Sequence, residues 1–180
     1  MILTDREIQL AIESGQIQID PQPDDDAYSS TSVDLTLDEP AEIWQILKGQ
    51  PIRPAAAGYN YHQLSIRKNK IQSINGHTLA PQDFILAWTR ETVSLPVTSR
   101  FAARVEGKSS LARLGIAVHL TAPTIHAGWR GQIQLEIVNF GPNEIIMDVG
   151  MRICQLIFEM TLGTPVQGYT GRYFGQSSRP

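Results

Sequence analysis

Residues 106–139 read EGKSSLARLGIAVHLTAPTIHAGWRGQIQLEIVN, and this stretch carries most of the information about fold and chemistry. Lys108, Ser109 and Ser110 stand at the start of an expected helical turn, and Arg113 follows on that turn. Further along, Glu136 is the only acidic residue between Glu106 and Glu144. A basic turn can bind an anion and a carboxylate can move protons, so the stretch suits chemistry on a phosphorylated substrate.

The end of this stretch predicts a β-strand. Alternation over residues 132–139 places three aliphatic side chains on one face and Gln132, Gln134 and Glu136 on the other. A strand carboxylate that simply faces solvent is the ordinary alternative. The functional interpretation places Glu136 in a semi-enclosed cleft, where a raised pKa would let it exchange protons with water near neutral pH.

The basic turn needs separate interpretation. GKSS at 107–110 resembles the end of a phosphate-binding P-loop, but the earlier glycine that this motif requires is replaced by Ala102. The Walker interpretation is therefore excluded. The two serines are good N-cap residues, and a helix start beside Lys108 and Arg113 would attract phosphate. A capped turn with solvated charges is the alternative.

The rest of the chain predicts an all-β fold of the sandwich or barrel type. Short apolar or alternating runs separated by Gly, Pro and Asn give the expected strands, at residues 33–37, 84–89, 101–105, 116–120, 132–139, 145–149 and 153–158. A short N-terminal helix starts at a capping box of Thr4 and Glu7 and stops at Gly15. The remaining segments are residues 41–47, which fit no single assignment, 49–59, an irregular excursion, and 163–180, a frayed tail or a lid.

Composition limits the functional classes. The 180 residues suffice for one domain with a real core, expected over residues 1–180. A net charge of -3 gives no basic field for nucleic acid. No run approaches the roughly 18 apolar residues of a membrane span, and the N-terminus has no signal-peptide pattern. The single Cys154 excludes an internal disulfide, so a cytoplasmic protein with no membrane or nucleic-acid partner is expected.

No zinc site is predicted in the protein. His119 and His126 lack the further ligands that a zinc site needs, and the cysteine pattern of zinc deaminases is absent. His119 is interpreted as a structural side chain at a strand end. Trp129, between Gly128 and Gly131, is interpreted as a packing residue at a turn.

The ordered motifs resemble those of the dCTP deaminases in the trimeric dUTPase superfamily. The matching segments are KSSLARLG at 108–115, HLTA at 119–122, GWRG at 128–131, LE at 135–136, LTDREI at 3–8, SVDL at 32–35 and GRYFGQ at 171–176. The resemblance implies a distorted β-barrel or jelly-roll subunit in a homotrimer with active sites at subunit interfaces. It implies zinc-free deamination of dCTP to dUTP for pyrimidine deoxynucleotide supply, with Mg²⁺ carried by the triphosphate. Feedback inhibition by dTTP is left open.

The resemblance also assigns roles to positions. Lys108, Ser109, Ser110 and Arg113 would meet the phosphates, with Ser109 and Arg113 also near the reacting water. Glu136 would be the proton shuttle, and the backbone of Ala122 would lie near the base and the water. The other candidate substrate contacts are His119, Thr124, His126, Gln134, Tyr169, Arg172 and Gln176.

Three positions depart from the family pattern. Lys108 stands where arginine is common, which keeps the charge but loses the bidentate fork. Thr124 stands where many members have arginine, which leaves one sugar or base contact unassigned. His126 stands where the superfamily usually has an aspartate that, in dUTPases and bifunctional members, orients the water that attacks phosphorus. Its absence argues against triphosphate hydrolysis. The alternatives are a bifunctional dCTP deaminase/dUTP pyrophosphatase and a catalytically silent nucleotide-binding module.

Overall fold

Strands dominate the computed structural model, which describes residues 1–45, 48–49, 51–60 and 68–178. The described helices are α1 (Asp5–Glu13), α3 (Ser109–Ala112) and two short 3-10 turns, η1 (Asp25–Ala27) and η2 (Val97–Ser99). The described strands are β1 (Gln18–Asp20), β2 (Tyr28–Ser29), β3 (Ser32–Thr36), β4 (Ala41–Trp44), β5 (Lys68–Ile71), β6 (His77–Leu79), β7 (Phe84–Ser94), β8 (Phe101–Gly107), β9 (Ile116–Ala117), β10 (Thr124–Ile125), β11 (Arg130–Asn139), β12 (Ile145–Met147) and β13 (Arg152–Met160).

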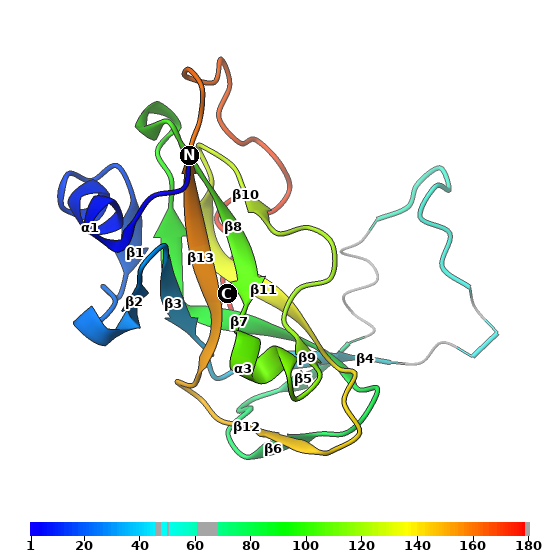
Figure 1. Cartoon of the computed structure of the whole chain (residues 1–180). Coiled ribbons are helices and arrows are strands. Elements are labelled where there is room, and N and C mark those ends of the chain that lie inside the picture. The colour runs from blue at the N-terminus through cyan, green and yellow to red at the C-terminus, as the bar shows by residue number, and fades with distance from the viewer. Residues whose placement is uncertain (46–47, 50, 61–67, 179–180) are drawn as a thin grey trace.

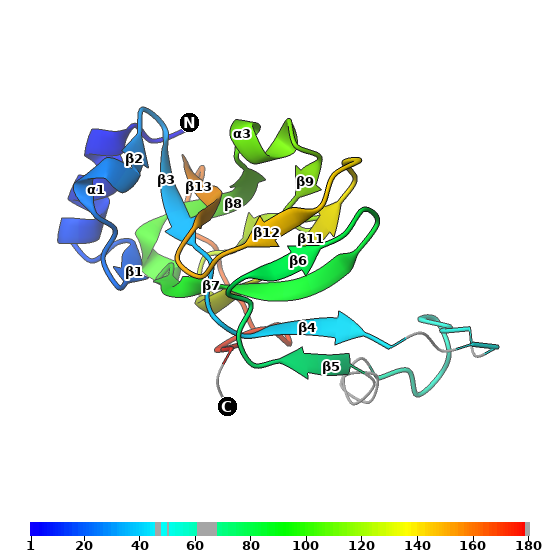
Figure 2. The ribbon, with the colours of Figure 1, turned by 90° about the horizontal axis from the view of Figure 1, so that it is seen from below.

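Two antiparallel sheets form the body of the molecule (Figures 1 and 2). The six-stranded sheet has the order β5-β4-β7-β11-β9, with β1 also paired to β7. The five-stranded sheet has the order β10-β8-β13-β3-β2, and β12 pairs separately with β6. An isolated bridge between Leu37 and Thr89 joins the two main sheets just beyond the end of β3.

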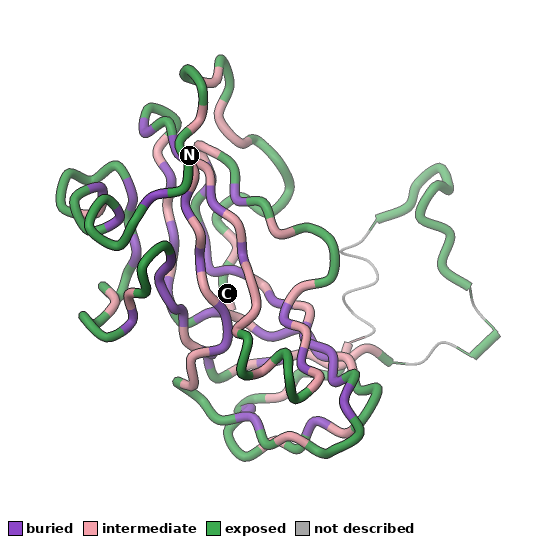
Figure 3. The backbone as a smooth tube through the Cα atoms, viewed as in Figure 1, coloured by how far each residue is buried: buried purple, intermediate pink, exposed green. Residues whose placement is uncertain are grey.

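The core draws on both sheets, because strands of each contribute aliphatic and aromatic side chains to one cluster. Leu35 and Phe158 come from the five-stranded sheet, and Ile85, Leu135 and Ile137 come from the six-stranded sheet. All five are essentially fully buried, and each such side chain contributes about 1.5–3 kcal/mol of transfer free energy. Figure 3 shows this burial along the central strands, while the outer loops and the tail are exposed.

The all-β prediction is confirmed, with several corrections of extent. The predicted strands at 33–37, 84–89, 101–105, 132–139 and 153–158 are present as β3, β7, β8, β11 and β13. The prediction for 145–149 is correct only for Ile145–Met147, which form β12. The prediction for 116–120 is correct only for Ile116–Ala117, because β9 pairs with β11 over those two positions alone. Within the described residues, the pairings give two open sheets rather than a closed barrel.

The segment 41–47, which the sequence assigned to no single element, contains a further strand. Residues 41–44 form β4, whereas residues 46 and 47 lie outside the described part of the chain. The predicted excursion at 49–59 is irregular where it is described: the Ala56 and Tyr59 amides each donate a turn hydrogen bond, to Arg53 and Ala56. Position 50 lies outside the described residues.

The N-terminal helix α1 is where the sequence predicts it, but its cap differs. Thr4 is the N-cap residue, and its hydroxyl bonds to the Glu7 carboxylate instead of a backbone N–H group. The Thr4 hydroxyl thus bonds to a side chain and caps no backbone N–H group. Ile8 and Ala11 are buried on the inner face of the helix. Among the described residues, no helix combines the length and apolar character needed to cross a membrane.

Candidate active site

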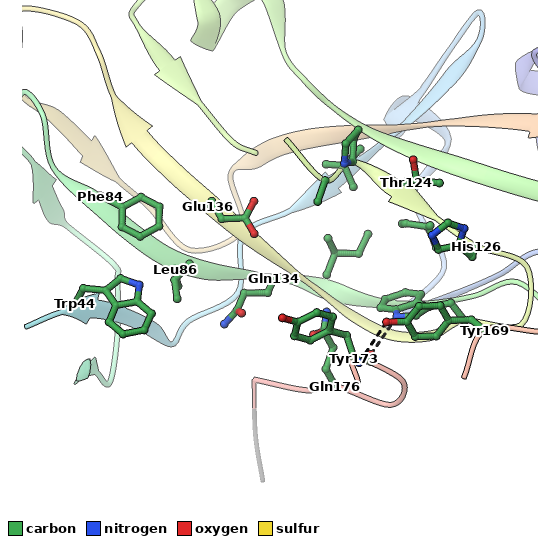
Figure 4. Close-up of a pocket in the computed structure, with 16 residues that line it drawn as sticks. Trp44, Phe84, Leu86, Thr124, His126, Gln134, Glu136, Tyr169, Tyr173 and Gln176 are labelled. Atoms are coloured by element: carbon green, nitrogen blue, oxygen red, sulfur yellow. Dashed lines mark hydrogen bonds between the residues drawn. The ribbon is translucent and has the colours of Figure 1, made fainter. Parts of the chain in front are cut away.

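Glu136 and Gln134 are placed on β11 by its long pairing with β7. Glu136 lies opposite Leu86, and Gln134 lies opposite Trp88. Both side chains line a pocket of about 460 Å³, within the range of about 300–1,000 Å³ typical of small-molecule sites. Figure 4 shows both side chains near the middle of this pocket.

Gln132 does not share this face, contrary to the prediction from alternation. The pairing of β11 with β7 shifts between Gln132 and Gln134, so that residues 89–91 lie opposite Ile133 alone. The Thr89 hydroxyl accepts a hydrogen bond from the Ile133 amide at 3.0 Å. Such a bulge changes which face the neighbouring residues occupy. As a result Ile133 lines the pocket and Gln132 does not.

The two ends of the pocket differ in character. One end is apolar and consists of Trp44, Phe84 and Leu86. Lys68 of β5 lies over the Trp44 ring, 5.4 Å from its centroid, and pairs with Glu42. This cation–π contact and ion pair fix the indole at the pocket wall. The opposite wall comes from β10 and the residues around it: Ala122, Pro123, Thr124, Ile125 and His126.

The C-terminal tail forms the third wall. Tyr169, Tyr173 and Gln176 all line the pocket. The Tyr169 ring stacks on His126, with centroids 5.8 Å apart and planes inclined by 7°. Figure 4 shows this pair at the end of the pocket away from Trp44. The C-terminal tail therefore lies against the site.

The pocket carries one carboxylate and no lysine or arginine among its described lining residues. That carboxylate is Glu136, which is only partly buried and forms no ion pair with any other described residue. It is therefore available to exchange a proton with a bound molecule. A triphosphate, by contrast, finds no cationic partner in the walls of this pocket.

The basic turn lies elsewhere in the same chain. Figures 1 and 2 show α3 beside β9, away from the tail that borders the pocket. Lys108 is the N-cap residue of α3, and Ser109 and Ser110 are its first helical residues, so the predicted serine caps are wrong. The Lys108 ammonium pairs with the buried Asp34 carboxylate. Both serines and Arg113, the C-cap residue, are exposed.

Gln155 braces the entry to this turn. Its amide donates to the Gly107 carbonyl at 3.0 Å, and its side-chain oxygen accepts from Ser32 at 2.6 Å. The end of β8 is thereby tied to β13 and β3. Two neighbouring strands thus hold a short turn whose own four residues could not fix its direction.

The structure brings together about half of the predicted site residues in one chain. Those in the pocket are Ala122, Thr124, His126, Gln134, Glu136, Tyr169 and Gln176. Those outside it are Lys108, Ser109, Ser110, Arg113, His119 and Arg172. His119 follows β9, and its Nδ1 atom is buried without a hydrogen-bond partner among the described residues.

Nine pocket residues were not predicted as site residues: Trp44, Phe84, Leu86, Val105, Pro123, Ile125, Trp129, Ile133 and Tyr173. Tyr173 lies inside the tail motif GRYFGQ and could have been found from it. Trp44 and Phe84 reach the pocket only because β4 and β7 are neighbours in the sheet. In the described part of the chain, no three His, Cys, Asp or Glu side chains are grouped to hold a metal ion.

Comparison with known proteins gives a consistent result. A family model described as dCTP deaminase-like matches residues 2–161. A dCTP deaminase of Rhodospirillum rubrum is 37% identical over 94% of this chain and 87% of its own length. A dUMP-forming dCTP deaminase of Beutenbergia cavernae is 37% identical over 98% of this chain and 91% of its own length.

A solved structure shares the fold. The crystal structure of a 2'-deoxycytidine 5'-triphosphate deaminase from Agrobacterium tumefaciens superimposes with a TM-score of 0.67 at 22% identity. The match covers 88% of this chain and 48% of that one, so this chain spans about half of its length.

Proposed function

The chain belongs to the dCTP deaminase-like family, and we propose that it converts dCTP and water into dUTP and ammonia. The observation that carries this proposal is the position of Glu136. It is the only acidic group that lines the pocket among the described residues. Deamination needs one group that both accepts and donates a proton, and a carboxylate can do both.

Glu136 is the proton shuttle in this proposal. It takes a proton from the water that attacks C4 of cytosine and later delivers a proton to the departing amino group. The C4–N bond breaks, ammonia leaves, and the C4 carbonyl of uracil remains. Ala122, on the pocket wall, offers backbone groups to orient the water and the base. A fixed backbone group can do this without reorganising during the reaction.

The phosphates must be bound by groups outside this pocket. A triphosphate needs several cationic or N–H partners, and no lysine or arginine occurs among the described lining residues. We assign this role to Lys108, Ser109, Ser110 and Arg113 on the exposed α3 turn of a neighbouring subunit. The substrate is then the Mg²⁺ complex of dCTP, held at the interfaces of a homotrimer.

The tail completes the site. Tyr169 and Gln176 already line the pocket, and the exposed Arg172 is free to turn toward the triphosphate when substrate is present. Thr124 and His126 also line the pocket and take the positions where the family pattern has arginine and aspartate. They are assigned to the sugar and base end of the substrate, together with Gln134.

One incubation separates the deaminase from its alternatives. The purified protein is mixed with Mg²⁺ and either dCTP or dUTP, and ammonia and pyrophosphate are measured. A deaminase releases ammonia from dCTP and no stoichiometric pyrophosphate. A bifunctional enzyme, a possibility that the dUMP-forming relatives keep open, releases both. A silent nucleotide-binding module releases neither.

Subunit mixing tests the interface. One preparation carries Glu136→Gln, and a second carries Arg113→Ala in a protein with intact Glu136. Each alone is expected to be nearly inactive. After the two are unfolded and refolded together, mixed trimers contain interfaces with both groups intact, so part of the activity returns. If both groups act within one subunit, mixing restores nothing.

A further inference from the structure

The C-terminal tail is bound in an ordered way to one short segment of its own chain, residues 127–132. The Tyr169 amide donates to the Ala127 carbonyl at 2.9 Å, and the Gly175 amide donates to the Arg130 carbonyl at 2.7 Å. The Trp129 indole N–H donates to the Tyr173 carbonyl at 3.0 Å. Trp129 is therefore more than a packing residue, because its indole holds the backbone of the tail.

Two glycines make room for this contact. A Cβ atom at Gly128 would lie 2.7 Å from the backbone of Gly168 and Tyr169. A Cβ atom at Gly131 would lie 2.9 Å from the Gln176 carbonyl oxygen. These neighbours are main-chain atoms that cannot rotate away. A side chain at either position would therefore push the tail off the segment.

Gln132, Asp38, Ser177 and Ser178 form a hydrogen-bonded cluster beyond the pocket, here called the latch. The Gln132 side-chain oxygen accepts hydrogen bonds from the Ser177 hydroxyl at 2.9 Å and the Ser178 amide at 2.7 Å. Its amide nitrogen donates to the Asp38 carboxylate at 3.0 Å and to the Thr89 carbonyl at 2.9 Å. The Ser178 hydroxyl donates to the same Asp38 oxygen at 2.7 Å.

Gln132 and Asp38 of the latch are mostly buried, so losing their hydrogen bonds costs free energy. Gln132 is 9% exposed and Asp38 is 8% exposed. Hydrogen bonds to an ionised carboxylate are stronger than those between neutral groups. When the tail leaves, Gln132 and Asp38 lose these donors and must be rehydrated. The tail therefore supplies hydrogen-bond donors to polar groups that are buried while it is bound.

We propose that Gly128, Gly131, Gln132 and Asp38 are positioning residues that dock the tail on the pocket of the same subunit. They touch no reacting atom in this assignment. They set the fraction of molecules in which Tyr169, Tyr173 and Gln176 close the pocket, and thereby the Michaelis constant for substrate. The docking itself rests on these hydrogen bonds and close backbone contacts, whereas its kinetic effect rests on the proposed deaminase function.

Tryptic cleavage after Arg172 measures docking without reference to activity. Arg172 is exposed, yet it lies between tail residues that are bonded to the body. Gln132→Met should release the fragment that begins at Tyr173 about tenfold faster than wild type, because protection follows the opening equilibrium. Gln16→Met, at an exposed position after α1, is the matched control. Equal rates of release from Gln132→Met and wild type would contradict the proposal that Gln132 docks the tail.

Substitutions at Ser178 control for the possibility that Gln132→Met disturbs the fold itself. Ser178→Ala removes one latch hydroxyl from the tail itself and leaves the sheets untouched, so release should still accelerate. Ser178→Thr keeps a hydroxyl and should restore most of the protection. If alanine and threonine at this position behave alike, the hydroxyl does not latch the tail.

Kinetics then test the consequence. Gln132→Met should raise KM for dCTP about tenfold, equivalent to about 1.4 kcal/mol, with a smaller change in kcat. In a protein that ends at Gln176, and so lacks Ser177 and Ser178, the same substitution should have little further effect. An equal rise in KM in both backgrounds would show that Gln132 acts independently of the latch. A protein without deaminase activity would leave the tryptic result intact and would contradict only the proposed function.

Discussion

The imidazole ring of His126 stacks on the phenol ring of Tyr169, with centroids 5.8 Å apart and planes 7° from parallel. The contact joins the wall of the pocket to the tail that covers it (Figure 4). An aspartate, which the family pattern favours at position 126, could not stack in this way. The change at this position therefore coincides with an aromatic contact that supports closure.

Removing residues 168–180 should raise KM for dCTP sharply and leave the assembled protein intact. The deletion takes Tyr169, Tyr173 and Gln176 out of the pocket wall, and a lid that is lost no longer excludes bulk water. The core strands are not part of the deletion. Steady-state kinetics and size-exclusion chromatography provide the measurements. Unchanged kinetics would show that the tail is a passive end.

Alternation in the sequence was sufficient to predict the long strands but not their faces. The pattern at 132–139 identifies β11 and the inward positions of Leu135 and Ile137. It misplaces Gln132, because the shift opposite residues 89–91 depends on a strand far away in the chain. Strands of two to four residues, such as β2 and β5, are too short for periodicity to identify them.

Glu136→Gln should abolish most deaminase activity while folding and nucleotide binding persist. The amide cannot take a proton from water, and loss of a general acid–base group costs about 10²–10⁴ in rate. Initial rates of ammonia release should be compared with those of Glu144→Gln, a control at an exposed loop position. Near-wild-type rates in the Glu136 variant would remove this residue from the mechanism.

Arg113→Ala should weaken binding of dCTP far more than binding of deoxycytidine. The guanidinium is assigned to the triphosphate, and hydrogen bonds to charged groups contribute about 1.5–3 kcal/mol each. Calorimetric titration with both ligands gives the comparison, and Arg6→Ala on α1 controls for a general loss of charge. Equal loss for nucleotide and nucleoside would contradict a phosphate-binding role.

The candidate site was predictable in its parts but not in its arrangement. Motifs in the sequence single out Glu136 and the turn that carries Lys108, yet one chain keeps them apart. The N-cap preference for serine also misplaced the start of α3. Lys108 occupies the cap, and its ammonium pairs with Asp34, 74 positions earlier. Such long-range ion pairs have no local signal in the sequence.

Cys154 should resist alkylation in the folded protein. Burial raises the pKa of its thiol, and the nearby carboxylates of Glu91 and Asp34 act in the same direction. In the unfolded chain the cysteine thiol has its ordinary pKa of about 8.5. The buried Cys154 thiol therefore makes its full contribution to the free energy of unfolding below that pH. The contribution falls as pH rises, because only the unfolded chain releases the proton. Iodoacetamide labelling at pH 8 should be slow without denaturant and fast with it. Fast labelling of the native protein would contradict the burial.

Deamination of dCTP should stop at dUTP. The resemblance to the dUTPase superfamily implies an aspartate for pyrophosphate release where this chain has His126, and an imidazole does not present the two acceptor oxygens of a carboxylate. The ring is also engaged with Tyr169, and the Thr124 hydroxyl does not replace the carboxylate. Chromatography of a dCTP reaction should therefore show dUTP and ammonia accumulating together. Recovery of dUMP and pyrophosphate at a rate that matches deamination would establish the bifunctional alternative and would mean that a group other than an aspartate at position 126 activates the attacking water.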